Sequence, residues 1–340
     1  MRKASTIKDV AREAGVGIST VSRVINDSGY VSQETREKVL AAMDELQYQP
    51  NEIARSLKRR HTRSIGLTVP EIGNPFFGEV AEAVEIAARE KGYTVLFSST
   101  RDDPKQEEVG IDLFLEKQVD GLIWFAPHNK SKLQTVLQQR RVPIVVITPE
   151  PVWWDVDSVC VNDTAGAYEA TAHLIQLGHR RIGYIAEPDA PTYSQERLKG
   201  YKAAFREHHL VTDESLIVRG DFREGSGARA VEALMDCSEP PTAIFAANDL
   251  MAIEALARLR TKGYRVPEDV AVVGFDDVKI AAIGGIELTT VSQPKQEVGQ
   301  EAVRLLIDRL SGEPRATRQV TFNPYLVVRK TCGQQIGSSS

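Results

Sequence analysis

The sequence predicts an all-α helix-turn-helix head followed by a larger α/β core made of two doubly wound parallel-sheet lobes. Two short amphipathic segments, separated by a glycine-containing turn, lie within residues 7–26. From Thr62 onward, apolar runs of strand length alternate with helical patterns, and the alternation occurs as two successive sets. Apolar strands separated by helices are typical of a parallel sheet covered on both faces, so two such sets predict two lobes.

The first helix of the head is predicted to begin after Thr6, which forms a capping-box-like pair with Asp9. Residues spaced by three and four positions give this helix one apolar face: Ile7, Val10, Ala11 and Ala14. The run Gly15-Val16-Gly17 then supplies a tight turn. This arrangement is helix-turn-helix spacing.

The second helix is predicted over residues 18–26, with Val21, Val24 and Ile25 available to pack inward. Its outward positions near the N-terminus are those that meet base edges in a helix-turn-helix protein: Ile18, Ser19, Thr20, Ser22 and Arg23. An arginine suits bidentate pairing with guanine, and an isoleucine suits contact with a thymine methyl group. The alternative is an ordinary helical surface with one exposed arginine.

A third helix is predicted from about Ser32 to Leu46, and Pro50 prevents it from continuing. Residues 51–57 then form a segment too short to be a stable helix alone. Its Leu57 has basic neighbours and suits a minor-groove wedge, an apolar tip that unstacks a base step. A disordered basic linker is the alternative for this segment.

Charge is divided unevenly along the chain. The net charge is −5, but the first 60 residues contain eleven basic and eight acidic residues, which gives +3. A basic head on an acidic body fits phosphate contacts confined to one end. Neither a membrane-spanning apolar run nor a secretory signal is apparent, so we expect a cytoplasmic protein without membrane contact. Cys160, Cys237 and Cys332 are expected to be packing residues rather than disulfide or metal ligands.

The run TIKDVAREAGVGISTVSRVINDSGYVSQETREKVLAAMDELQYQPNEIARSLK resembles the heads of the lactose-repressor (LacI/GalR) family of bacterial transcription regulators. The resemblance implies a homodimer on double-stranded, palindromic operator DNA, with residues 51–57 as a hinge helix that orders on the operator. It assigns DNA binding to Thr6, Ile18, Ser19, Thr20, Ser22, Arg23, Asn26, Asn51, Ala54, Arg55, Leu57 and Lys58. One departure is Gly17, where the family usually has a serine cap, and glycine is tolerated there at a cost of a few tenths of a kcal/mol.

In the core, strands are predicted at 64–69, 93–97, 121–125, 143–147, 181–186, 242–246 and 270–275. The intervening helices are predicted at 76–91, 105–117, 165–177, 195–208 and 250–259. Because ligands of open α/β sheets bind beyond the carboxyl ends of the strands, the default site is a cleft between the lobes.

This core also resembles the family, whose effector region is like the periplasmic sugar-binding proteins (type I). Its recurring phrases are Leu177-Gly178-His179-Arg180-Arg181-Ile182, Ala247-Asn248-Asp249 and Gly274-Phe275-Asp276-Asp277. The expected parts are a head at 1–50, a hinge helix and linker at 51–62, an N-terminal lobe at 63–161 plus 292–322, a C-terminal lobe at 162–291 plus 323–333, and a flexible tail at 334–340. The chain is expected to cross back towards the first lobe after Leu288-Thr289-Thr290-Val291.

By position, the resemblance assigns effector contacts to Phe77, Arg197, Asn248 and Asp276. Two further candidates are Phe76, which precedes Phe77, and Trp154, which is expected in a loop near the rim of the cleft. A guanidinium, an amide and a carboxylate suit vicinal hydroxyls, while an aromatic face suits a sugar ring. Several alternatives remain open. Phe77 has helix core as its alternative, Asn248 has the capping of a helix as its alternative, and one of Asp276 and Asp277 is expected to start a helix. Trp124 is expected to be core.

The expected function is a repressor of a carbohydrate-utilisation operon, controlled by a mono- or oligosaccharide effector. The alternatives are a solute-binding protein of sugar transport and a regulator with a purine or nucleoside effector. Thr148-Pro149 and Asn162-Asp163 depart from the family pattern, and the first removes an expected ligand carboxylate. Recognised catalytic and phosphate-cradling motifs are missing from the sequence, so no enzyme activity and no cofactor are expected. The tail lacks leucine heptads, so a tetramer is not expected.

Overall fold

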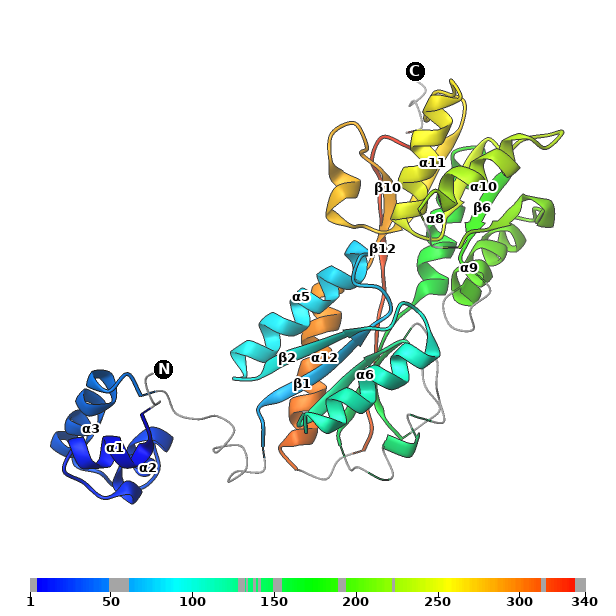
Figure 1. Cartoon of the computed structure of the whole chain (residues 1–340). Coiled ribbons are helices and arrows are strands. Elements are labelled where there is room, and N and C mark those ends of the chain that lie inside the picture. Colours follow the sequence, from blue (N-terminus) through cyan, green and yellow to red (C-terminus); the bar gives the residue numbers. More distant parts are fainter. Residues whose placement is uncertain are drawn as a thin grey trace, which may run out of the picture. The chain divides into compact units, whose positions relative to one another are not determined.

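The chain divides into two compact units, Met1–Thr62 and Arg63–Ser340, in a computed structural model (Figure 1). The structure describes residues 5–48, 61–127, 132, 134–136, 139, 142–148, 155–188, 194–221, 224–312 and 316–333. Among the described helices, none combines the length and apolar character needed to cross a bilayer. We refer to the two units as the head and the core.

The head contains three helices: α1 (Ile7–Glu13), α2 (Ile18–Asn26) and α3 (Gln33–Glu45). Their inward faces meet in a small core that includes the fully buried Val10, Val21 and Val39. The Asp9 carboxylate accepts hydrogen bonds from the Thr6 N–H at 3.0 Å and the Thr6 hydroxyl at 2.7 Å. The predicted helix-turn-helix is therefore confirmed, including its first cap.

The first sheet of the core has six parallel strands in the order β11-β5-β4-β3-β1-β2. Their bounds are β1 (Ser64–Val69), β2 (Thr94–Ser99), β3 (Gly121–Phe125), β4 (Ile144–Thr148), β5 (Asp157–Val161) and β11 (Gln319–Phe322). Helices α5 (Pro75–Glu90), α6 (Pro104–Glu116) and α12 (Lys295–Leu310) pack on this sheet, and α5 lies beside α12 (Figure 1).

Both faces of the first sheet are covered. On β3, Ile123 and Phe125 join the cluster that contains the apolar side chains of α5 and α12. The alternate residues Leu122 and Trp124 join a second cluster with Phe114 of α6. This alternation explains why the strand reads as continuously apolar, and it confirms that Trp124 is core.

The second sheet has the order β12-β10-β9-β8-β6-β7, and it is parallel except for the antiparallel pair of β12 and β10. Its strands are β6 (Ile182–Ala186), β7 (Ile217–Arg219), β8 (Ala243–Ala246), β9 (Ala271–Asp276), β10 (Thr289–Ser292) and β12 (Tyr325–Val327). The accompanying helices are α8 (Asp163–Gln176), α9 (Ser194–Glu207), α10 (Ser226–Met235), α11 (Asp249–Thr261), η1 (Glu214–Leu216) and η2 (Lys279–Ala282).

The described chain passes between the two sheets three times. It does so from β5 to α8, from β10 to α12, and from β11 to β12. The predicted crossing after Val291 is confirmed, because β10 belongs to the second sheet and α12 packs on strands of the first. Three short connections give the two lobes a common hinge region.

Helices α8 and α9 approach closely at Gly200, and this contact supports a specific prediction. A Cβ added at Gly200 would meet the carbonyl oxygen of Thr164 and lie 2.8 Å from the Ala167 Cβ. We therefore expect Gly200→Ala to reduce the free energy of unfolding by about 1–3 kcal/mol, measured by urea unfolding. Gly284→Ala is the matched control, since nothing lies within 4 Å of its added Cβ. Equal stability of the two variants would contradict this packing.

Candidate functional site

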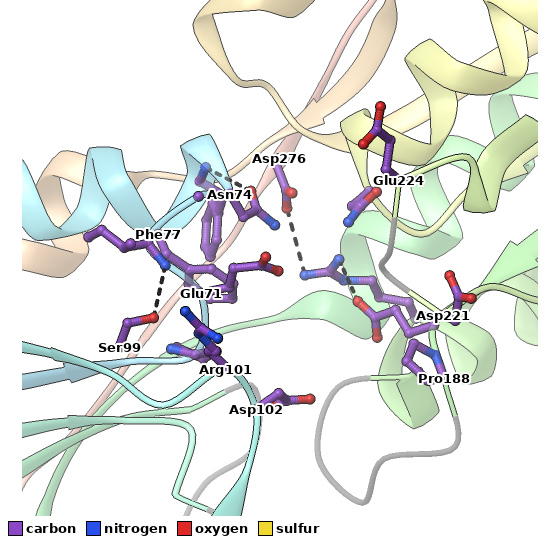
Figure 2. A pocket seen from close by; sticks show the side chains of 17 residues that line it. Glu71, Asn74, Phe77, Ser99, Arg101, Asp102, Pro188, Asp221, Glu224 and Asp276 are labelled. Atoms are coloured by element: carbon purple, nitrogen blue, oxygen red, sulfur yellow. Dashed lines mark hydrogen bonds and ion pairs between the residues drawn. The ribbon is translucent and has the colours of Figure 1, made fainter. Parts of the chain in front are cut away.

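A cavity of about 770 Å³ lies in the core, between segments that follow strands of both sheets (Figure 2). The first sheet contributes the residues after β1 and β2, among them Asn74, Phe77 and Arg101. The second sheet contributes residues at or after the ends of β6, β7, β8 and β9. These are carboxyl ends of parallel strands, the position expected for a ligand site in open α/β sheets.

Five of the six side chains assigned to the effector line this cavity together: Phe76, Phe77, Arg197, Asn248 and Asp276. The sixth, Trp154, lies outside the described residues. Proximity in one cavity is established for the five residues, and their contact with an effector stays a prediction.

The first-sheet side of the cavity has an aromatic corner formed by Phe76 and Phe77, and both rings pack against Phe125. Edge-to-face contacts join them, with ring centroids 5.2 Å apart for Phe76–Phe77 and 5.1 Å for Phe77–Phe125. Helix α5 begins there because Asn74 Oδ1 accepts a hydrogen bond from the Phe76 N–H at 3.0 Å. Phe77 is half-buried against the core and also lines the cavity, so it contributes to packing, while its contact with an effector stays a prediction.

Arg197 of α9 is buried and organises the second-sheet side of the cavity. Its Nε donates to Asp163 Oδ2 at 2.9 Å, and its Nη1 donates to Glu187 Oε1 at 3.1 Å. Its Nη2 lies 3.8 Å from Asp276 Oδ1, an ion pair that Figure 2 marks. The guanidinium carbon also lies 4.0 Å from the ring centroid of Phe275. These contacts hold the guanidinium fork in one orientation.

One guanidinium faces three buried carboxyl groups, and this imbalance changes their protonation. Burial raises the pKa of Glu187 to about 8, although Arg197 opposes the shift. Burial likewise raises the pKa of Asp276 to about 7, with Arg197 again acting in the opposite direction. The pKa of Asp163 is raised by burial as well. A buried carboxylate that lacks sufficient positive charge binds a proton more readily.

Asp276 and Asp277 have different partners. Asp276 Oδ1 accepts from Gln293 Nε2 at 2.7 Å and lines the cavity. Asp277 instead accepts from Arg329 Nη2 at 2.6 Å. The expectation that one of the pair starts a helix is wrong, because the residue preceding η2 is Val278. Arg329 lies far from Asp277 in the sequence, so sequence spacing does not reveal that the two side chains pair.

Asn248 has two roles in the fold. Its Oδ1 accepts from the Met251 N–H at 2.8 Å and so caps α11, while the residue also lines the cavity. The cysteines Cys160, Cys237 and Cys332 are free thiols, the first and last buried and Cys237 half-buried. Within the described part of the chain, acidic, histidine and cysteine side chains do not gather into a metal site.

The sequence did not identify the acidic surplus of the cavity. Its lining contains six carboxyl residues and two arginines: Glu71, Asp102, Glu187, Asp221, Glu224 and Asp276, with Arg101 and Arg197. The strand-end rule was the available signal for Glu187, because it directly follows Ala186, the last residue of β6.

In the head, the predicted base-reading positions lie on α2. Ile18, Ser19 and Arg23 are exposed, whereas Thr20, Ser22 and Asn26 are half-buried. The Asn26 amide donates to the Ser22 carbonyl at 2.6 Å, and Thr6 is exposed at the start of α1. The remaining assigned residues lie outside the described part of the chain: Asn51, Ala54, Arg55, Leu57 and Lys58.

Comparison with known proteins relates both units to regulators. Residues 6–51 match the family described as bacterial regulatory proteins, lacI family, and residues 171–332 match the periplasmic binding protein-like domain. The transcriptional regulator DegA of Bacillus subtilis (strain 168) is 38% identical, over 96% of this chain and 97% of its own length. The transcriptional repressor PurR of Klebsiella pneumoniae (strain 342) is 37% identical, over 96% of each chain.

Solved structures extend the similarity to the whole architecture. A transcriptional regulator CelR–cellobiose complex is 37% identical, with a TM-score of 0.73 over 96% of this chain and 99% of that one. The lac repressor dimer bound to operator and the anti-inducer ONPF is 29% identical, with a TM-score of 0.87 over 97% and 99% of the two chains. The two-lobe core with a helix-turn-helix head is therefore shared with these proteins.

Proposed function

Because the chain belongs to the LacI family of bacterial regulatory proteins, we propose that this DNA-binding transcriptional repressor controls a carbohydrate-utilisation operon through a sugar-like effector in the cavity. Like these relatives, it is a transcriptional regulator and not an enzyme. The lobes of the core are proposed to divide at the residues predicted from the sequence, and the protein is proposed to act in the cytoplasm.

The cavity carries the effector part of the proposal. It brings a guanidinium, an amide and a carboxylate to one side and the aromatic corner of Phe76 and Phe77 to the other. Oriented polar groups suit the hydroxyls of a sugar, and an aromatic ring suits the apolar face of the sugar ring. The relative CelR forms a complex with cellobiose, which supports the same ligand class here.

A purine or nucleoside effector is the second candidate. The half-buried Phe77 ring at the cavity offers a surface on which a flat base can pack. A transport-type binding protein is disfavoured, because such a protein has no use for a helix-turn-helix head.

We propose that the repressor acts as a homodimer. Apolar side chains exposed on the core support this: Ile280 and Ile283 near η2 are 40% and 55% exposed, and Phe97 on the edge strand β2 is 46% exposed. A two-fold dimer would present two heads to the two halves of a palindromic operator.

A bridge between the lobes suggests how effector binding reaches the rest of the chain. Lys295 Nζ donates to the carbonyl oxygens of Asp276 and Asp277 at 2.6 and 2.7 Å. The same ammonium lies 3.5 Å from Glu79 Oε2 on α5, and Glu79 Oε1 accepts from the Lys279 N–H at 3.1 Å. An effector bound to Asp276 would change the hydrogen bonds of this bridge and would thereby shift one lobe against the other. The response is limited by the effector's preference between the two states.

A gel-shift titration at low salt tests the DNA-binding part. The purified protein is expected to retard palindromic DNA from the region of its own gene, and failure to retard any such DNA would refute the repressor function. Adding a sugar panel and a purine base to the same titration identifies the effector and the sign of its effect.

The proposed wedge gives a sharper test. Leu57→Ala is expected to weaken operator binding by about 10- to 100-fold while leaving effector affinity within twofold, because a minor-groove wedge contacts DNA alone. Val211→Ala is the control, since Val211 is 89% exposed on the core. An equal loss of operator and effector affinity in Leu57→Ala would rule out the wedge.

A further inference from the structure

Glu187 lines the cavity, and one of its carboxylate oxygens is not satisfied by any residue that the structure describes. The residue is 2% exposed, and its Oε1 accepts from Arg197 at 3.1 Å. Its Oε2 is buried and has no hydrogen-bond partner among the described residues. Leaving a buried acceptor unmet costs free energy, so such an atom in a ligand cavity marks a position for a donor from the ligand.

The charges around Glu187 restrict what that donor is. The Arg197 guanidinium is already shared with Asp163 and Asp276. The cavity lining as a whole carries more carboxyl groups than guanidinium groups. An anionic group placed beside Glu187 would meet the surplus of carboxyl groups, whereas a hydroxyl or an ammonium group would meet an acceptor.

We propose that Glu187 is a specificity-determining residue of the effector site: its Oε2 accepts a hydrogen bond from a hydroxyl or ammonium donor and excludes effectors with an anionic group at that end. This inference rests on the proposed function and narrows its ligand class to uncharged or amino sugars, against phosphorylated or acidic ones. Burial raises the pKa of Glu187 to about 8, and a hydrogen-bond donor at Oε2 would stabilise the carboxylate form and lower this pKa, so binding of such an effector is expected to release the proton.

The test compares matched probes on the full-length protein. Glucose, glucosamine and glucose 6-phosphate, together with cellobiose and cellobionic acid, are titrated calorimetrically, with operator retention measured in the same samples. We expect an uncharged or amino member to bind at least about tenfold more tightly than its anionic counterpart. Tighter binding of glucose than of glucosamine would identify a hydroxyl as the donor to Glu187, and the reverse order would identify an ammonium group.

The variant Glu187→Gln keeps the shape of the side chain but removes its charge. It is expected to weaken binding of the preferred probe by about tenfold and to reduce the discrimination against the anionic probe to about threefold. Glu85→Gln is the matched control, because Glu85 pairs with Arg89 at 3.3 Å on the surface of α5, away from the cavity lining. Circular dichroism and thermal unfolding verify that both variants are folded.

Two outcomes would overturn the inference while the repressor function stands: anionic probes that bind as tightly as uncharged ones, or unchanged selectivity in Glu187→Gln. If none of the probes binds although operator DNA is retained, the carbohydrate effector is refuted, and this assignment of Glu187 is refuted with it. Loss of operator retention in the unmodified protein would instead refute the proposed function.

Discussion

Arg197→Met is expected to reduce the free energy of unfolding by about 3–5 kcal/mol near neutral pH and to abolish the response to effector. The substitution leaves Asp163, Glu187 and Asp276 buried without the guanidinium that all three face. Methionine retains much of the side-chain volume, so the loss reports charge rather than a cavity. Urea unfolding of the full chain measures the stability, and the operator titration measures the response.

Two further measurements make this prediction specific. Arg265→Met is the control, because Arg265 forms an exposed pair with Asp269, and the loss of such a pair should change the stability far less. Lowering the pH should reduce the deficit of Arg197→Met, since protonated carboxyl groups no longer require a cation. A deficit that is the same at pH 5 and pH 8 would show that the guanidinium acts through packing alone.

The fold was predictable because local sequence and tertiary context agree in most elements. In α2, the helix bounds and the inward side chains Val21 and Val24 follow from apolar spacing alone. In β3, burial on both faces makes every residue apolar, which distinguishes a central parallel strand from an exposed one. The antiparallel strand β12 was not predicted, because it has three residues and its pairing is set by β10.

The cavity was predictable only in part, for a physical reason. Strand-end positions and the family resemblance pointed to Arg197, Asn248 and Asp276, which do line one cavity. The role of Glu187 depends on which charges surround it in space, and these come from α8, α9 and β9. Sequence spacing does not count charges brought together by folding, so the acidic surplus became visible only in the structure.

The backbone conformation after β9 explains the separate partners of Asp276 and Asp277. Both backbones have positive φ values, 119° and 53°, so the chain turns sharply after β9 and sends the two side chains apart. The turn leaves one carboxylate at the cavity and the other at Arg329. Adjacent acidic residues therefore serve different parts of the core.

The stability of the protein is expected to fall as the pH rises from 5 to 8. Folding raises the pKa of Glu187 from 4.5 to about 8, and that of Asp276 from 3.8 to about 7, mainly through burial. Between those values the folded chain binds more protons than the unfolded chain, so the free energy of unfolding decreases with pH. Each group contributes a slope of up to about 1.4 kcal/mol per pH unit, and the decrease from these two groups ends above pH 8.

Glu187→Gln should remove much of this decrease and should stabilise the protein by about 1–3 kcal/mol at pH 8.5. The variant loses one buried negative charge, while Arg197 still pairs with Asp163 and Asp276. Urea unfolding at constant ionic strength from pH 5 to 9 measures both curves. Asp269→Asn is the control, because Arg265 holds the pKa of Asp269 at about 2 and the group is fully ionised across this window.

A residue that costs stability when charged, yet is needed for effector affinity, is under selection for binding rather than for folding. Parallel curves for Glu187→Gln and the unmodified protein would show that Glu187 carries no surplus charge, and the trade-off between stability and binding would not exist.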